Sequence, residues 1–98
     1  MCAKKYSIYL MNGLTGTCSD IRLKKNIMHH GYSPSGIPIY KFQYRSNVFA
    51  GADFRHAKFF GVMAQDLIVH APLAICQNPY DGYLRVDYSM IDVDFQRI

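Results

Sequence analysis

Residues 39–45 place the strongest constraint on the fold of this 98-residue chain. After the first two positions, apolar and polar side chains alternate, which is typical of a β-strand with one buried face. Residues 83–88 show the same alternation. Such a strand is stable only when it pairs with other strands and covers its apolar face. The chain is therefore expected to form at least one sheet packed on one side.

Turn signals divide the remainder into short segments. Asn12-Gly13, Gly16, residues 31–38 and residues 78–82 are rich in the Gly, Pro, Asn and Ser of turns, and 46–58 reads as a loop or hairpin tip. Further strands are predicted at 6–11, 59–63 and 73–76, a helix at 64–70 that ends before Pro72, and the start of a helix in 89–98. Residues 20–27 fit a strand or a helix. The fold class predicted is α+β, a small single domain of short strands with one or two short helices.

Composition excludes several classes of protein. Half of the residues are hydrophobic and only 18% are charged, which argues against disorder. Eight Tyr and six Phe suggest more apolar surface than so short a monomer can hide, so a homo-oligomer is expected. The net charge of +4 comes from scattered residues, and no apolar stretch has the length of a membrane span. Neither nucleic acid nor a membrane is therefore an expected partner.

The cysteines and histidines show no metal-ligand spacing. Cys2, Cys18 and Cys76 are an odd number without a CxxC pair, which predicts neither a disulfide framework nor a zinc site and suits a reducing compartment. His29-His30, His56 and His70 are interpreted as surface or satisfied core residues. No metal and no cofactor are expected.

The run at residues 19–27 carries the most distinctive chemistry. It places the hydroxyl of Ser19 five residues before the amine of Lys24. A serine becomes a nucleophile when a base removes its proton, and a lysine of lowered pKa is such a base. Burial or a neighbouring cation would lower that pKa, and Arg22 and Lys25 are close in sequence. The simpler alternative is that Ser19-Asp20 caps a following helix.

The same run resembles the opening of the endosialidase-type intramolecular chaperone domain (peptidase S74 family), the self-cleaving domain of phage tail fibres and tailspikes. Three later blocks are similar to that family in the same order. They are a Gly-apolar-Pro and aromatic-strand block at 36–44, an "FGVMAQDL" block at 60–67 followed by residues 72–75, and a "DGYLRVDYSMI" block at 81–91. Together the four blocks span almost three quarters of the chain.

The resemblance implies roles for particular residues. Ser19 would be the nucleophile and Lys24 the general base of a single-turnover serine peptidase that cuts its own Cys18–Ser19 bond. Asp20 and Asn26 would orient the pair or stabilise the oxyanion. The other motif residues are interpreted as structural: Gly61 for close backbone approach, Gln65 for satisfying buried amides, and Asp81, Gly82, Tyr83, Asp87 and Tyr88 as the remainder of the motif.

The resemblance also implies a domain division and partners. Residues 1–18 would precede the cleavage site and residues 19–98 would form the chaperone domain, without the C-terminal helix usual in the family. The expected function is a stand-alone chaperone-type domain linked to trimer assembly of a phage or prophage fibre protein. The alternative is a non-catalytic assembly or adaptor module that binds a fibre protein or another partner. The expected location is the cytoplasm of a bacterial host, or the virion.

Overall fold

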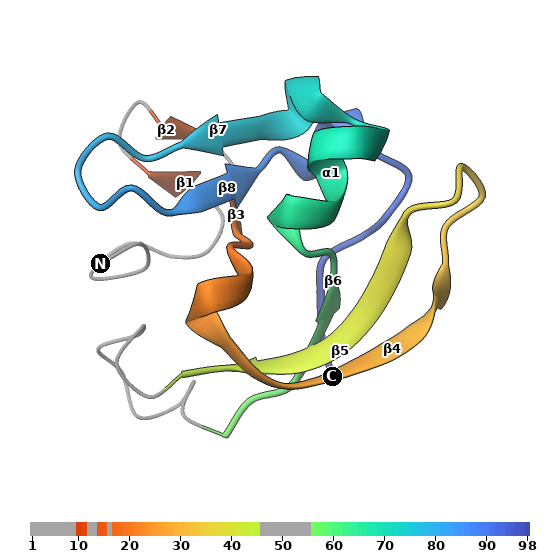
Figure 1. The fold of residues 1–98 in the computed structure, drawn as a ribbon. Helices are drawn as coiled ribbons and strands as arrows, with labels where there is room; N and C mark the ends of the chain where they lie inside the picture. Colours follow the sequence, from red (N-terminus) through yellow and green to blue (C-terminus); the bar gives the residue numbers. More distant parts are fainter. Residues whose placement is uncertain (1–9, 12–13, 16, 46–55) are drawn as a thin grey trace.

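Nine short strands and one α-helix are found in the described residues (Figure 1). The structure is a computed structural model that describes residues 10–11, 14–15, 17–45 and 56–98. The strands are β1 Leu10–Met11, β2 Leu14–Thr15, β3 Thr17–Cys18, β4 Lys24–Tyr32, β5 Pro38–Tyr44, β6 Phe59–Gly61, β7 Ile75–Gln77, β8 Leu84–Val86 and β9 Gln96–Arg97. The helix is α1 Ala64–His70, and 3₁₀ turns occupy η1 Ile21–Leu23, η3 Pro72–Ala74 and η4 Tyr88–Met90.

The strands form antiparallel sheets, which confirms the predicted α+β class. One sheet has the order β3-β8-β7 and another the order β4-β5-β6-β9, with β1 and β2 as a separate pair. The helix α1 lies beside the three-stranded sheet, while the long β4–β5 pair curves away on the other side (Figure 1). Homo-oligomer formation, which the family resemblance would make trimeric, stays a prediction.

The β4–β5 pair is bent at two irregular points. The register of its ladder shifts around Asn26, whose φ is 53°, and again around Gly31, whose φ is 113°. Asparagine and glycine are the residues that most readily adopt positive φ, and an irregular register bends a strand. At the other end of the ladder, Lys24 lies directly opposite Tyr44.

The buried side chains form two clusters that meet after β6. The first cluster is mostly aromatic and contains Cys18, Leu23, Phe42, Tyr44, Ala57, Phe59 and Met63. The second is aliphatic and contains Ile37, Val62, Ala64, Leu67, Ala74, Val86 and Val93. Neighbouring residues Val62 and Met63 belong to different clusters, so the short segment between β6 and α1 joins the two parts of the core.

Most predicted elements are confirmed, with one clear error. The helix at 64–70, the strand at 39–45 and the turn at 78–82 occur as expected, and the undecided segment is a 3₁₀ turn leading into β4. The predicted strand at 6–11 is described only at its end, and Asn12-Gly13, Gly16 and most of 46–58 lie outside the described residues. The helical start predicted in 89–98 is wrong, because this segment has only the turn η4 and then pairs with β6 as β9.

The expectation that the cysteines are unpaired is wrong for Cys18. This residue takes part in a disulfide, whereas Cys76 is free and exposed. Cysteine spacing along the chain does not reveal which thiols meet after folding, because pairing depends on three-dimensional proximity.

Candidate functional site

Ser19, Asp20 and Lys24 are almost completely buried. Their relative exposures are 0%, 0% and 1%, although all three are polar. Polar groups are stable in such surroundings only when hydrogen bonds replace those they made with water. The partners of these three residues therefore define the candidate site.

The carboxylate of Asp20 is fully occupied. It accepts five hydrogen bonds, three from the backbone amide and guanidinium of Arg22, one from the amide of Leu84 and one from the side chain of Gln65. Burial alone would raise the pKa of Asp20, but these hydrogen bonds outweigh it and hold the pKa well below its usual range. The bond to the Arg22 amide caps η1, as the capping alternative predicted.

Gln65 contacts the site residue Asp20, whereas Asn26 lies away from the site. The amide of Gln65 accepts a hydrogen bond from the backbone of Ile21 at 2.9 Å and donates one to the buried carboxylate of Asp20 at 2.9 Å. Asn26 instead lies on the exposed part of β4 and donates to Gln43 at 2.6 Å. Its side chain makes no contact with Ser19 that would support a role in orienting the nucleophile.

The Ser19 hydroxyl lies against the buried phenol of Tyr88. The two oxygens are 3.4 Å apart, and the Tyr88 oxygen also accepts the amide proton of Val62 at 3.0 Å. Burial raises the pKa of Tyr88 to about 12, although the bonds from Ser19 and Val62 act in the opposite direction. Gly61 permits this approach, because a Cβ there would lie 2.6 Å from the Tyr88 oxygen.

The Lys24 amine lies between the two core clusters. It donates to the carbonyl of Val62 at 2.6 Å and lies 4.0 Å from the centre of the Phe42 ring. Burial lowers the pKa of Lys24 well below its ordinary value, while Asp20 and Asp66 oppose the shift. Burial, rather than a neighbouring cation, is therefore the cause that the structure supports. Arg22 is paired with Asp20 instead.

The peptide bond between Cys18 and Ser19 is held at both of its polar atoms. The Cys18 carbonyl accepts a hydrogen bond from the Tyr44 hydroxyl at 2.6 Å, and the Ser19 amide donates to the carbonyl of Leu84 at 3.2 Å. The next carbonyl, that of Ser19, accepts from Ala64 at the start of α1 at 2.8 Å. These contacts fix the orientation of the bond relative to the core.

Ser19 and Lys24 are linked indirectly, through Tyr88 and Val62. The carbonyl of Val62 binds the lysine, and its amide binds the tyrosine that contacts the serine. Within the described part of the chain, no direct hydrogen bond joins the serine to the lysine. The arrangement therefore places a buried hydroxyl and an amine of lowered pKa on the same chain of contacts, and these are the two groups that general-base chemistry on a serine requires.

The remaining motif residues shape the turns around this site. Asp81 accepts from the Tyr83 amide, and Asp87 caps η4 by accepting from Ser89. Gly82 has a φ of 76°, which glycine adopts without strain. The Tyr83 ring lies under the Arg22 guanidinium, 4.9 Å from its centre.

Two residues of the site were not predicted for their roles. Tyr44 was expected only as part of a strand, and Val62 only as part of an apolar run. A signal for Tyr44 was present, because a tyrosine at the buried position of an alternating strand needs a partner for its hydroxyl. Its partner lies 26 residues earlier in the chain, so only the fold identifies it.

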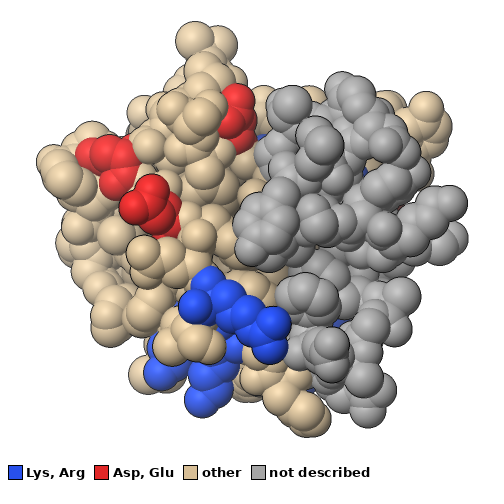
Figure 2. Space-filling view, turned by 180° about the vertical axis from the view of Figure 1, so that it is seen from behind, with Lys and Arg blue, Asp and Glu red and all other residues tan. Residues whose placement is uncertain are grey.

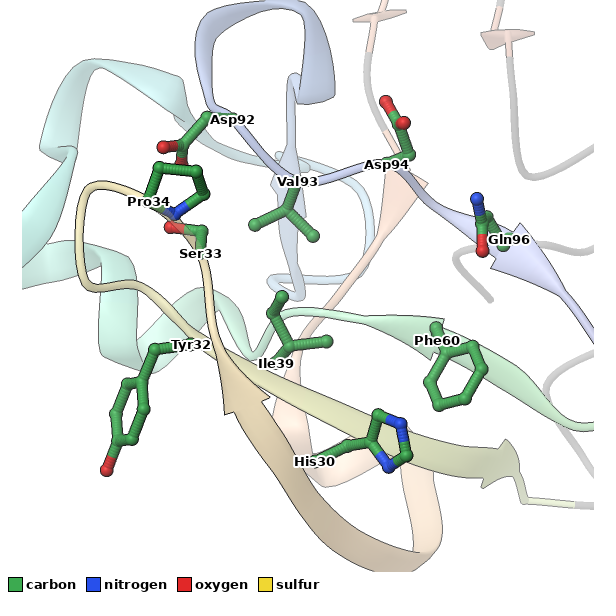
Figure 3. Close-up of a pocket in the computed structure, with 10 residues that line it drawn as sticks. All are labelled: His30, Tyr32, Ser33, Pro34, Ile39, Phe60, Asp92, Val93, Asp94 and Gln96. Atoms are coloured by element: carbon green, nitrogen blue, oxygen red, sulfur yellow. The ribbon is translucent and has the colours of Figure 1, made fainter.

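A separate cavity of about 370 Å³ lies away from Ser19 and Lys24. Its walls come from β4, β5, β6, β9, the turn after β4 and the segment before β9 (Figure 3). Val93 and Ile39 face each other across it, and the Asp94 carboxylate points away from them (Figure 3). The Asp92 carboxylate accepts hydrogen bonds from Ser35. Polar side chains, among them His30, Asp92, Asp94 and Gln96, therefore share its walls with apolar and aromatic ones.

The described histidines all lie at the surface, as interpreted from sequence. Among the residues that the structure describes, no three His, Cys, Asp or Glu side chains are close enough together to hold a metal ion. In the same residues, no helix has the length and apolarity needed to cross a membrane. On the face seen in Figure 2, basic side chains gather in one small group and acidic side chains lie apart from it.

Comparisons of the chain with protein-family models, with curated proteins and with solved structures found no match. The resemblance to the self-cleaving chaperone domain therefore stays a prediction that rests on the four sequence blocks.

Proposed function

We propose that this chain is a chaperone-type domain of phage or prophage fibre assembly that cleaves its own Cys18–Ser19 bond. The observation that carries the proposal is the complete burial of Lys24, with a lowered pKa, in the same small region as Ser19. A neutral lysine amine can take a proton at neutral pH, whereas an exposed lysine is almost entirely protonated.

The proposed reaction has two steps. In the first, the Ser19 oxygen adds to the Cys18 carbonyl carbon while its proton passes to the Lys24 amine. The carbon–nitrogen bond then breaks, the Ser19 nitrogen takes the proton back from Lys24, and an ester joins Cys18 to the serine oxygen. In the second step, water hydrolyses the ester, which leaves a carboxyl group on Cys18 and a free amino terminus on Ser19.

Intact-mass measurement tests this proposal. Freshly purified protein should lose residues 1–18 over days at neutral pH and leave a product that begins at Ser19. Ser19→Ala should abolish the loss, whereas Ser89→Ala, at an exposed serine in η4, should not change it.

A trapping experiment separates self-cleavage from a contaminating protease. Hydroxylamine attacks esters, so it should release the same product faster and leave a hydroxamate on Cys18. Unchanged full-length mass under all these conditions would exclude the self-cleavage proposal. Product formation in Ser19→Ala would exclude it equally, because the nucleophile would then be elsewhere.

A second candidate is a non-catalytic assembly or adaptor module. It is favoured by apolar side chains that gather on α1 and η3 without cover from the described chain. The exposures of Ile68, Val69 and Leu73 are 58%, 83% and 86%. Contiguous exposed apolar side chains of this kind often mark a protein-binding surface.

We expect the double variant Val69→Glu with Leu73→Glu to reduce self-association, because charges at a buried interface are strongly unfavourable. Sedimentation velocity at micromolar concentration would report a shift toward monomer. Tyr80→Glu is the matched control, since Tyr80 is 91% exposed in the turn between β7 and β8, at the other end of that sheet from α1 (Figure 1). A wild-type monomer at every concentration tested would contradict assembly through this surface.

A further inference from the structure

Tyr44 is placed to act on the scissile carbonyl. Its hydroxyl donates to the Cys18 carbonyl oxygen at 2.6 Å, a short hydrogen bond between two buried groups. In the proposed reaction this oxygen gains a full negative charge when the Ser19 oxygen adds to the carbon. A donor already aimed at that atom stabilises the transition state more than the starting peptide.

The Tyr44 ring is held rigidly. The rings of Phe42 and Phe59 pack against it edge-on, each with a centroid distance of 5.4 Å. Only 1% of the Tyr44 surface is exposed. A donor fixed in a water-excluded core does not have to reorganise as charge develops, which is the condition under which such donors are most effective.

The sheet also places this donor beside the base. Lys24 and Tyr44 are directly opposed residues at the start of the β4–β5 ladder, so one strand pair carries both groups. The turn η1 then returns the chain from Lys24 to the Cys18–Ser19 bond. The base, the carbonyl donor and the nucleophile thus come from three successive segments around the same part of the core.

We propose that the Tyr44 hydroxyl is a catalytic group of the self-cleavage site, which stabilises the oxyanion on Cys18. The proposal rests on the proposed self-cleavage. As the Ser19 oxygen bonds to the carbonyl carbon, the carbonyl electron pair moves onto the Cys18 oxygen, and Tyr44 keeps its proton while donating a stronger hydrogen bond. When the pair returns to form the ester carbonyl, the Ser19 nitrogen leaves with the proton supplied by Lys24.

Tyr44→Phe removes this donor and keeps the ring. We expect the first-order cleavage rate to fall about 10²- to 10³-fold, as for other oxyanion donors. The pH dependence of the remaining rate should be unchanged, because the titrating base is Lys24. Tyr40→Phe is the matched control: it removes a partly buried phenol from the same strand, one that bonds Asp66 rather than the scissile bond. Its rate should stay close to that of the wild type.

Ring-fluorinated tyrosine at position 44 gives a second measurement that does not depend on losing a hydrogen bond. A more acidic phenol is a stronger donor, so cleavage should accelerate several-fold with folding intact. Tyr44→Phe that folds and cleaves within threefold of the wild type, or a fluorinated protein that is no faster, would overturn the role of Tyr44 and leave self-cleavage standing. Full-length wild-type protein that never cleaves would overturn both.

Discussion

Asp20→Asn is expected to destabilise the domain by about 2 to 4 kcal/mol, a large part of the stability of a small protein. The carboxylate has five donors aimed at its two oxygens, including the amides of Arg22 and Leu84. An asparagine of the same size brings its own NH₂ group against one of these donors. The exposed Arg22 side chain contributes little of the loss, because 60% of it is in solvent.

The loss of stability in acid provides an independent test of the role of Asp20. The folded-state pKa of Asp20 lies below its unfolded value of 3.8, so the unfolded chain binds the proton first as pH falls. The contribution of Asp20 is therefore complete above that unfolded value and is lost as pH falls toward the folded one. Asp20→Asn should remove this part of the acid slope.

Chemical denaturation at a series of pH values measures both effects, in a Ser19→Ala background so that cleavage does not interfere. Asp87→Asn is the matched control, because Asp87 also caps a 3₁₀ turn by accepting from the amide two residues later, but at a partly exposed position. It should cost less than about 1 kcal/mol, since asparagine is an equally good cap. Equal losses for the two variants would show that Asp20 is only a cap.

Local sequence signals predicted the elements that depend on local forces. The strand β5 follows from its alternation, and α1 ends where Pro72 prevents the helix from continuing. The segment at 20–27 was ambiguous because Asp20 caps a turn while the residues after it pair with β5. The last segment was predicted wrongly because β9 forms by pairing with β6, a contact between residues far apart in sequence.

The residues of the candidate site likewise fall into two groups, those that the sequence identified and those that only the fold reveals. The sequence identified Ser19 and Lys24 and stated that burial was needed, and the structure supplies that burial. It could not identify Tyr44 or Val62, whose roles arise from backbone atoms brought together by the fold. It also assigned Asn26 a supporting role from proximity in sequence, whereas the bend in β4 leaves this residue on the surface.

Lys24→Met is expected to abolish cleavage while leaving the domain folded. Loss of a general base slows such reactions by about 10²- to 10⁴-fold, which over days would leave little or no product. Methionine is apolar, unbranched and of similar length, so it can fill the space over Phe42. Lys25→Met at the neighbouring, partly exposed position should cleave normally.

The same variant should change how stability depends on alkaline pH. Because the folded-state pKa of Lys24 lies well below 10.5, the unfolded chain holds a proton that the folded chain lacks across that interval. Stability therefore rises with pH through this window, and in a Ser19→Ala background Lys24→Met should remove that rise. At pH 7 the free energy of unfolding of Lys24→Met should stay within about 1 kcal/mol of the parent or exceed it. The variant loses the hydrogen bond to Val62, but it also removes the cost of burying an amine. A parent whose stability does not rise with pH, or a Lys24→Met protein that still cleaves, would remove Lys24 as the base.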